Sequence, residues 1–314
     1  MSIRNVFLYW YGKEYKLVSI LRKLMYLHSI NGKGYKIHLI NNDNVQNYIK
    51  NIPNYFSKLL PAHKADFVRV NVICDYGGIW LDSDTIVLDS LDSLFDIIET
   101  KKGFFILENN KELCNGVFGS KKKTHLMIEW KKNMINILDE KQENISWRSI
   151  GISILEKLHK NNKTLYNNYK IFNGLDNLYP INWDDCVDEF INKPYENYKN
   201  IIRKFQPLVV IVNSVYKKIE NKSIREILEG NMPINYFINK SIQNMNLLGH
   251  VNICEIFKYN DNKFKQWIKR FYKNKTTKTN KITKNNKITK KKYTLCNLKK
   301  SNISSKTLKN KSKK

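Results

Sequence analysis

The chain has 314 residues, 42% of them hydrophobic, which is enough to bury the core of one large domain or two small ones. Its net charge of +27 is unevenly spread, because sixteen lysines and no acidic residue lie from Lys273 onward, which leaves +11 for the rest of the chain. Five scattered cysteines without C-x-x-C spacing argue against a disulfide framework or a zinc site and favour a reducing compartment.

The first forty residues alternate between strand and helix patterns. Residues 3–10 read as a buried strand, apolar residues at helical spacing predict a helix from Tyr15 to Ser29, and Tyr35–Ile40 alternates as a second strand. Strand, helix and strand in this order favour a right-handed βαβ unit and a parallel sheet. The sequence therefore predicts an α/β fold.

A second helix and strand follow and contain most of the strong local signals. Proline at the first helical position and a helical apolar period predict a helix over Pro61–Tyr76, which Gly77-Gly78 ends because glycine adopts a left-handed backbone without strain. Ile79–Leu81 reads as a short buried strand. Asp66 and Arg69, three residues apart, are expected to form a charged pair on the helix surface.

Two carboxylates come directly after this strand. Asp82 and Asp84 are two residues apart, so in extended chain both side chains project to the same side, at the strand end where α/β sheets place ligands. Converging carboxylates repel each other, and an oxygen-preferring divalent cation bridging to a phosphate compensates this repulsion. A D-x-D triplet alone is weak evidence, but helix, Gly-Gly, buried aromatic strand and D-x-D in that order are far more specific.

The remaining elements continue the alternation of helices and strands. The next predictions are a helix over Ser93–Thr100, a strand over Phe104–Leu107, a loop over Glu108–Gly119, a helix over His125–Leu138 and a strand over Pro207–Val212.

The end of the chain has a different composition. Residues 273–314 repeat lysine with threonine and asparagine and cannot bury enough apolar surface to offset chain entropy, so we expect a disordered tail after a single domain over 1–272. Such a tail attracts anionic surfaces weakly, and no specific nucleic-acid partner is expected. No run of about 18 apolar residues and no signal-peptide pattern is found, so we expect a cytoplasmic protein or one at a membrane periphery.

The segment AdxxRxxxxxxyGGIWLDSD, which runs from Ala65 to Asp84, resembles the core of the D-x-D sugar transferases of the glycosyltransferase family 32 type. These comprise the yeast-type initiating mannosyltransferases, the capsular-polysaccharide transferases and, more distantly, the glucosylating domains of clostridial toxins. The resemblance implies a GT-A fold, that is, a nucleotide-sugar-binding α/β fold with a mostly parallel sheet flanked by helices. It also implies a bound Mn²⁺ or Mg²⁺ and transfer with retained anomeric configuration.

The resemblance also assigns roles to the residues of the segment. Asp84 is implied to ligate the metal directly, and Asp82 to contact the donor ribose and the metal. Arg69 and Asp66 are implied to hold hydroxyl groups of the donor sugar. Trp80 stands where the family usually has tyrosine, and the full set expected to bind substrate also includes Ser83.

Two further parts of the chain extend the resemblance. These enzymes often open with an apolar strand ending in W-x-G, which would place Trp10 and Tyr9 near the nucleotide base, although a core aromatic explains Trp10 equally well. Asn115 lies in an N-G-V segment that the families place beside the sugar or acceptor, but Asn-Gly is also a common hairpin turn.

The sequence departs from the family pattern in two places. A T-G-P turn lacks its proline here, at Trp147–Leu158, which puts a phosphate role for Ser149 or Gly151 in doubt. The strand ending near Val212 is not followed by the usual histidine and tryptophan, so Asn213 or Ser214 is the candidate third metal ligand, with His250 more distant.

The predicted activity is metal-dependent, retaining transfer of a hexose from a UDP- or GDP-linked donor to a glycan or protein acceptor. An inverting reaction would need a base, for which Glu108 is best placed. Two other classes stay open: an inactive transferase-like fold that binds nucleic acid or a membrane surface through its basic charge, and a metal-dependent phosphoryl hydrolase, which normally needs more acidic or histidine ligands.

Overall fold

A computed structural model describes residues 4–108, 112–174, 190–191, 207–211, 217–245, 253–260 and 262–270. The chain divides into two compact units, Met1–Leu247 and Leu248–Lys314, which are treated separately below. The predicted domain boundary at Lys273 and the lysine-rich tail lie outside the described residues, so both stay predictions.

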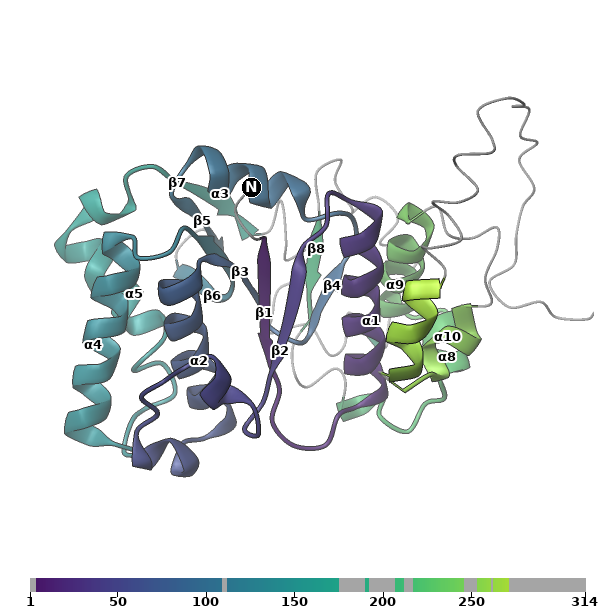
Figure 1. Ribbon diagram of the computed structural model, residues 1–314, viewed down its shortest axis with the longest axis horizontal. Coiled ribbons are helices and arrows are strands. Elements are labelled where there is room, and N and C mark those ends of the chain that lie inside the picture. Colours follow the sequence, from purple (N-terminus) through teal and green to yellow (C-terminus); the bar gives the residue numbers. More distant parts are fainter. Residues whose placement is uncertain are drawn as a thin grey trace, which may run out of the picture. The chain divides into compact units, whose positions relative to one another are not determined.

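A six-stranded sheet in the order β2-β1-β3-β6-β5-β7 forms the centre of the first unit (Figure 1). Its strands are β1 (Asn5–Tyr9), β2 (Lys36–Ile40), β3 (Gly78–Leu81), β5 (Gly103–Glu108), β6 (Glu112–Ser120) and β7 (Tyr169–Asn173). The pairs β1–β2, β1–β3 and β5–β7 are parallel, whereas β6 is antiparallel to both β3 and β5. Five of these strands therefore run in one direction and β6 in the other.

Helices flank this sheet on its two sides (Figure 1). The helices α2, α4 and α5 contact one another and the sheet on one side, while α1 and α3 lie on the other. The α-helices that the structure describes in this unit are α1 (Lys16–Asn31), α2 (Pro61–Tyr76), α3 (Asp92–Thr100), α4 (His125–Lys141), α5 (Ile152–Asn161), α8 (Ile224–Glu229) and α9 (Pro233–Asn244). The α/β fold class with a mostly parallel sheet and flanking helices is thus confirmed, as is the predicted span of α2.

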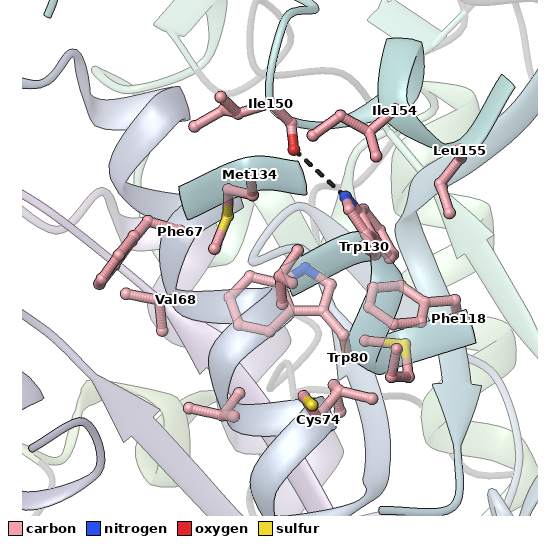
Figure 2. Packing of buried hydrophobic residues seen from close by; sticks show 14 of the residues in the cluster. Phe67, Val68, Cys74, Trp80, Phe118, Trp130, Met134, Ile150, Ile154 and Leu155 are labelled. Atoms are coloured by element: carbon pink, nitrogen blue, oxygen red, sulfur yellow. Dashed lines mark hydrogen bonds between the residues drawn. The ribbon is translucent and has the colours of Figure 1, made fainter. Parts of the chain in front are cut away.

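Successive strand residues face opposite sides, as the period of two requires. Phe7, Trp80 and Phe118 pack into a core shared with α2, α4 and α5, whereas their neighbours in each strand pack on the other side. Figure 2 shows Trp80 and Phe118 beside Trp130 of α4, whose indole Nε1 donates a hydrogen bond to the backbone oxygen of Ile150, 3.2 Å away. That bond ties the segment before α5 to the core.

The Gly77-Gly78 pair has two separate functions at the junction of α2 and β3. Gly77 ends the helix with φ at 68°, and Gly78 has φ at 126°, both in the range that favours glycine. A Cβ on Gly78 would lie 2.4 Å from the backbone oxygen of Asn5. The glycines therefore permit both the reversal of the chain and the close approach of β3 to β1.

The loop predicted over Glu108–Gly119 is wrong for most of its length. Glu112–Ser120 is strand β6, which lies between β3 and β5 in the centre of the sheet. The Asn-Gly pair suggested a turn, but both residues lie within the strand. A Cβ on Gly119 would lie 2.5 Å from the Phe104 ring, so glycine is needed here for packing. The hairpin-turn interpretation of Asn115 is consequently wrong too.

A two-stranded antiparallel sheet joins β4 (Thr85–Val87) to β8 (Leu208–Val210). Strand β4 also contacts α1 and α9. These two helices are linked by a hydrogen bond between Ser241 Oγ of α9 and Nε2 of the buried His28 of α1, 2.9 Å apart. The strand predicted over Pro207–Val212 thus exists but is shorter, and its partner β4 was not predicted.

The second unit is described only in part. It contains α10 (Ile253–Lys258) and helical residues 262–270, in which the rings of Phe264 and Trp267 stack with 6.3 Å between centroids. Within the residues described for the two units, none of the helices combines the length and apolar character that crossing a membrane requires.

Candidate active site

The predicted site residues gather where α2, the end of β3 and the middle of β6 meet. Arg69, in the third turn of α2, is the centre of the cluster. Its Nη2 lies 3.1 Å from Asp82 Oδ1, its Nε lies 3.4 Å from Asp66 Oδ1, and its Nη1 donates to the backbone oxygen of Asn115 at 2.5 Å. One guanidinium thus joins a helix, a strand end and a neighbouring strand.

The charged pair predicted for the surface of α2 is buried instead. The exposed fraction is 6% for Asp66 and 5% for Arg69. Helix α2 packs against β6, a central strand of the sheet. The helix face that makes this contact also holds Asp66 and Arg69, so both side chains are buried. Burial raises the pKa of Asp66 to about 6, although the charge of Arg69 opposes this rise.

Asp82 is positioned from three directions. Trp80 donates from Nε1 to Asp82 Oδ1 at 2.8 Å, and the Arg69 guanidinium carbon lies 5.1 Å from the centre of the Trp80 ring. The backbone N–H of Asp82 donates to the oxygen of Gly116 at 2.8 Å, and a Cβ on Gly116 would lie 2.8 Å from Asp82 Oδ2. Oδ1 of Asp82 is therefore held by Trp80 and Arg69, and Gly116 leaves room for Oδ2, while a third of the side chain (33%) stays exposed.

One carboxylate oxygen of Asp84 has no hydrogen-bond partner among the residues that the structure describes. Its Oδ1 is buried and accepts no hydrogen bond from any residue that the structure describes. Burial, reinforced by the charge of Asp82, raises the pKa of Asp84 well above its usual range. A desolvated, unpaired carboxylate oxygen beside a second carboxylate is the donor type that a hard divalent cation takes. These two residues therefore fit Mn²⁺ or Mg²⁺.

A complete ligand set is not assembled by the described residues alone. No group of three or more His, Cys, Asp or Glu side chains in the described ranges is arranged to hold a metal ion. Asn213, Ser214 and His250, the candidates for a third ligand, lie outside those ranges. The metal prediction therefore depends on Asp82 and Asp84.

Asn115 and Gly151 complete the surroundings of Asp66. Asn115 Nδ2 donates to Asp66 Oδ1 at 2.8 Å. A Cβ on Gly151 would lie 2.4 Å from Asn115 Nδ2 and 2.9 Å from Asp66 Oδ2, so only glycine fits without displacing them. The bond from Trp130 to Ile150 holds this backbone in position (Figure 2). The importance of Gly151 for packing was missed, because nothing in the local sequence connects it with α2.

Tyr9, Trp10 and Ser83 lie at the ends of β1 and β3. Ser83 Oγ donates to the backbone oxygen of Tyr9 at 3.0 Å, and the Tyr9 hydroxyl donates to Asn42 Oδ1 at 2.5 Å. Trp10 follows β1 directly, and its indole Nε1 donates to the oxygen of Lys13 at 3.3 Å. The Ser83 hydroxyl is thus engaged in joining the two strand ends, and the predicted base neighbours lie on the adjacent strand end.

Comparison with known proteins places this cluster in context. A family model described as "Capsular polysaccharide synthesis protein" matches residues 1–199. An uncharacterized protein of Arabidopsis thaliana is 36% identical over 73 residues, which cover 23% of this chain. That match spans only 11% of the length of the Arabidopsis protein.

Three solved structures show likeness over most of the chain. GlyE, a glycosyltransferase of Streptococcus pneumoniae, is 14% identical with a TM-score of 0.40, over 77% of this chain and 64% of its own. A glycosyltransferase involved in glycosylation of the major capsid of PBCV-1 is 11% identical with a TM-score of 0.43, over 70% and 100% of the two chains. The galactosyltransferase LgtC, in complex with donor and acceptor sugar analogs, is 10% identical with a TM-score of 0.40, over 76% and 95%.

The family match covers more than half of the chain and includes α2, β3 and β6, and with them the whole cluster around Arg69. This protein belongs to the capsular polysaccharide synthesis protein family.

Proposed function

We propose that this protein is a metal-dependent glycosyltransferase of the GT-A type that moves a hexose from a nucleoside diphosphate sugar to a hydroxyl group of a glycan. The observation that carries the proposal is the buried Oδ1 of Asp84, which has no partner among the described residues, next to Asp82 and the cluster around Arg69. Membership of a polysaccharide synthesis family supports a saccharide substrate.

Asp82 and Asp84 would hold Mn²⁺ or Mg²⁺ together with the donor diphosphate. When bound, such a cation supplies positive charge that stabilises the negative charge developing on the departing diphosphate. The protein contributes a carboxylate pair whose position is fixed in advance, because Trp80, Arg69 and the backbone of Gly116 all contact Asp82. Less reorganisation is then needed when the donor binds.

Arg69 is best described as a positioning residue. Three of its nitrogens already contact Asp66, Asp82 and the Asn115 backbone, and it is 5% exposed. It is therefore proposed to act on the donor through the carboxylates that it orients. Asp66, which accepts from Asn115, has a second oxygen, Oδ2, close to Gly151, and we propose that this carboxylate accepts a hydrogen bond from a hydroxyl group of the donor sugar.

In the proposed transfer step, the oxygen of the acceptor hydroxyl bonds to the anomeric carbon while the bond from that carbon to the phosphate oxygen breaks. The electron pair of the broken bond stays on the diphosphate, and the hydroxyl proton passes to a diphosphate oxygen. Retention of configuration, which the family resemblance implies, fits a step in which the acceptor approaches from the face that the diphosphate leaves.

The test uses the full-length chain with UDP-glucose, UDP-galactose, UDP-N-acetylglucosamine and GDP-mannose, each with Mn²⁺, Mg²⁺ or EDTA. Turnover of one donor that needs a metal and is lost in Asp84→Asn supports the proposal. Asp75→Asn is the matched control, because Asp75 lies near the C-terminal end of α2, away from Asp66, and pairs with Lys131. Absence of donor turnover and donor binding with every metal would refute the proposal and favour a binding role for the fold.

A second measurement is independent of turnover. A ligand that binds only the folded state raises thermal stability, by about 2.7 kcal/mol at a concentration 100 times its Kd. Mn²⁺ is expected to raise the melting temperature of the wild type and of Asp75→Asn, and to leave that of Asp84→Asn unchanged.

A further inference from the structure

Exposed apolar side chains concentrate around the first turn of α2. Among the described residues, five large apolar side chains are exposed: Tyr11, Leu60, Tyr76, Ile128 and Trp147. Trp147 is 67% exposed and Leu60 55%, and Leu60 is the residue immediately before Pro61, where α2 begins. Tyr11, at 48%, and Trp147 contact residues in the first turn of this helix, as described below. We call Tyr11 and Trp147 the aromatic rim.

Trp147 lies on the segment that also reaches the active site. Its ring is 6.3 Å from the ring of His63, centroid to centroid. His63 precedes Asp66 by three residues, so the two side chains lie on the same side of the helix about 4.5 Å apart along its axis. A turn closed by Ser149 N–H to the oxygen of Ser146, at 3.0 Å, then leads back to Gly151, which packs on Asp66. An exposed indole is thus joined to the donor site by one short loop.

Tyr11 occupies a neighbouring position on the helix. The Nζ of Lys64 lies 4.4 Å from the centre of the Tyr11 ring and also donates to the backbone oxygen of Ser57 at 2.9 Å. Lys64 is 3% exposed and holds the Tyr11 ring through a cation–π contact, while nearly half of Tyr11 (48%) stays exposed. His63 and Lys64 are consecutive, so Trp147 and Tyr11 each contact one residue of the first turn of α2.

We infer that the aromatic rim is the acceptor platform, where a pyranose ring of the acceptor glycan stacks on Trp147 with Tyr11 as a second contact. This inference rests on the proposed function. One face of a pyranose presents C–H groups, which complement the negative face of an aromatic ring, while its hydroxyl groups remain directed at water and polar side chains. A protein partner is disfavoured because a stable protein interface needs about 20–30 residues on each side, far more than this rim supplies.

The location of the aromatic rim also favours the acceptor glycan over the donor sugar as its ligand. The donor is proposed to bind Asp66 and the two carboxylates after β3, and the exposed Trp147 contacts His63, one helical turn before Asp66. An acceptor stacked there would be held beside the donor without occupying its site. Holding the two reactants together converts a bimolecular step into an effectively unimolecular one, which is the main contribution that positioning makes to a transfer reaction.

The experiment compares transfer with hydrolysis in the full-length chain. With the donor that the wild type consumes, transfer to methyl α-D-mannopyranoside, methyl β-D-galactopyranoside and maltose is measured alongside donor hydrolysis. Trp147→Ala is expected to lower the ratio of transfer to hydrolysis about tenfold and to raise the acceptor KM, and Trp147→Phe should retain most of the ratio because it keeps an aromatic face. Tyr76→Ala, which removes an exposed ring at the other end of α2, is the matched control.

Failure of the inference and failure of the proposed function give different results. A wild type that consumes a donor but uses none of the three acceptors, or a Trp147→Ala ratio equal to that of Tyr76→Ala, overturns the acceptor platform and leaves the transferase intact. No donor consumption at all overturns the proposed function. In that case the platform is tested by the fluorescence of the wild type and of Trp147→Phe on addition of the same glycosides: a saturable change lost in the variant supports stacking, and no change overturns it.

Discussion

Arg69 and Asp82 are joined across 3.1 Å although one lies inside a helix and the other follows a strand thirteen residues later. Arg69 reaches Asp82 while its other nitrogens contact Asp66 and the backbone of Asn115. A planar guanidinium with a fixed fork of donors can satisfy three directions at once, which a single ammonium cannot. The four residues therefore act as one unit, and the predictions below test it at different points.

Arg69→Lys is expected to reduce both activity and stability. Lysine keeps the charge but cannot contact all three partners, and a buried polar group left without its hydrogen bond costs about 1–3 kcal/mol, more when it is charged. Urea denaturation of the variant should show this loss. Arg225→Lys is the matched control, because Arg225 pairs with Glu229 at 2.7 Å on an exposed helix surface, where such a pair contributes about 0.5 kcal/mol. Equal losses in the two variants would contradict the unit described here.

Trp80→Phe is expected to weaken metal binding. Phenylalanine fills most of the space but lacks the N–H that contacts Asp82, and loss of a hydrogen bond to a charged group costs about 1.5–3 kcal/mol. Trp130→Phe removes a comparable indole N–H from the same core, where the acceptor is a backbone oxygen. Both variants should be destabilised, but only Trp80→Phe should raise the Mn²⁺ concentration needed for half-maximal activity. A shift of the same size in Trp130→Phe would argue against a direct effect on Asp82.

Gly151→Ala is expected to reduce activity without unfolding the protein. The new methyl group would have to displace Asn115 Nδ2, 2.4 Å from its position, and with it the hydrogen bond to Asp66. A displacement of about 1 Å near a reacting centre can lower the rate on the order of 100-fold. The measurement is kcat/KM for the donor, together with circular dichroism of the folded chain. Ser146→Ala, an exposed change on the same segment, should behave as the wild type in both.

His28 is expected to make the stability of the protein depend on pH below neutrality. Burial lowers the pKa of His28 to about 3 in the folded protein, against about 6.5 when unfolded. The unfolded chain therefore binds the extra proton between these values. The contribution of neutral His28 to the free energy of unfolding is fully present above pH 6.5. It is lost as the pH falls toward 3, by up to about 4 kcal/mol.

Urea titrations of His28→Gln and the wild type across this range give the check. The difference in free energy of unfolding between the two proteins should shrink by several kcal/mol as the pH is lowered. His125→Gln, at a histidine whose side chain is 69% exposed, should leave the wild-type pH dependence in place. A constant difference for His28→Gln would show that burial does not keep this histidine neutral.

Elements with strong local signals were predictable from the sequence. Helix α2 begins at a proline and ends at a glycine pair, and both limits agree with prediction because capping and backbone strain act within a few residues. Strand β6 was missed because its glycines serve neighbours that are distant in sequence: Gly116 makes room for Asp82, and Gly119 for Phe104. A single sequence contains no record of such contacts.

The candidate site was predictable in its membership but not in its connections. Asp66, Arg69, Asp82 and Asn115 were each selected, yet the helix pair was expected on the surface and is buried. Burial of that pair follows from the position of β6, so one wrong element produced the wrong environment. The contributions of Gly151 and Trp130 depend on packing between α4, α5 and α2, which no local pattern encodes.

The register of β6 restricts insertions and deletions in this part of the chain. Leu81 pairs with Val117, and the Asp82 N–H donates to the oxygen of Gly116, so the site depends on an unbroken count of residues along β6. Loss or gain of one residue there would turn every following side chain to the opposite face of the sheet. In natural relatives, insertions and deletions should therefore be excluded between Asn115 and Ser120 and accumulate on either side of β6.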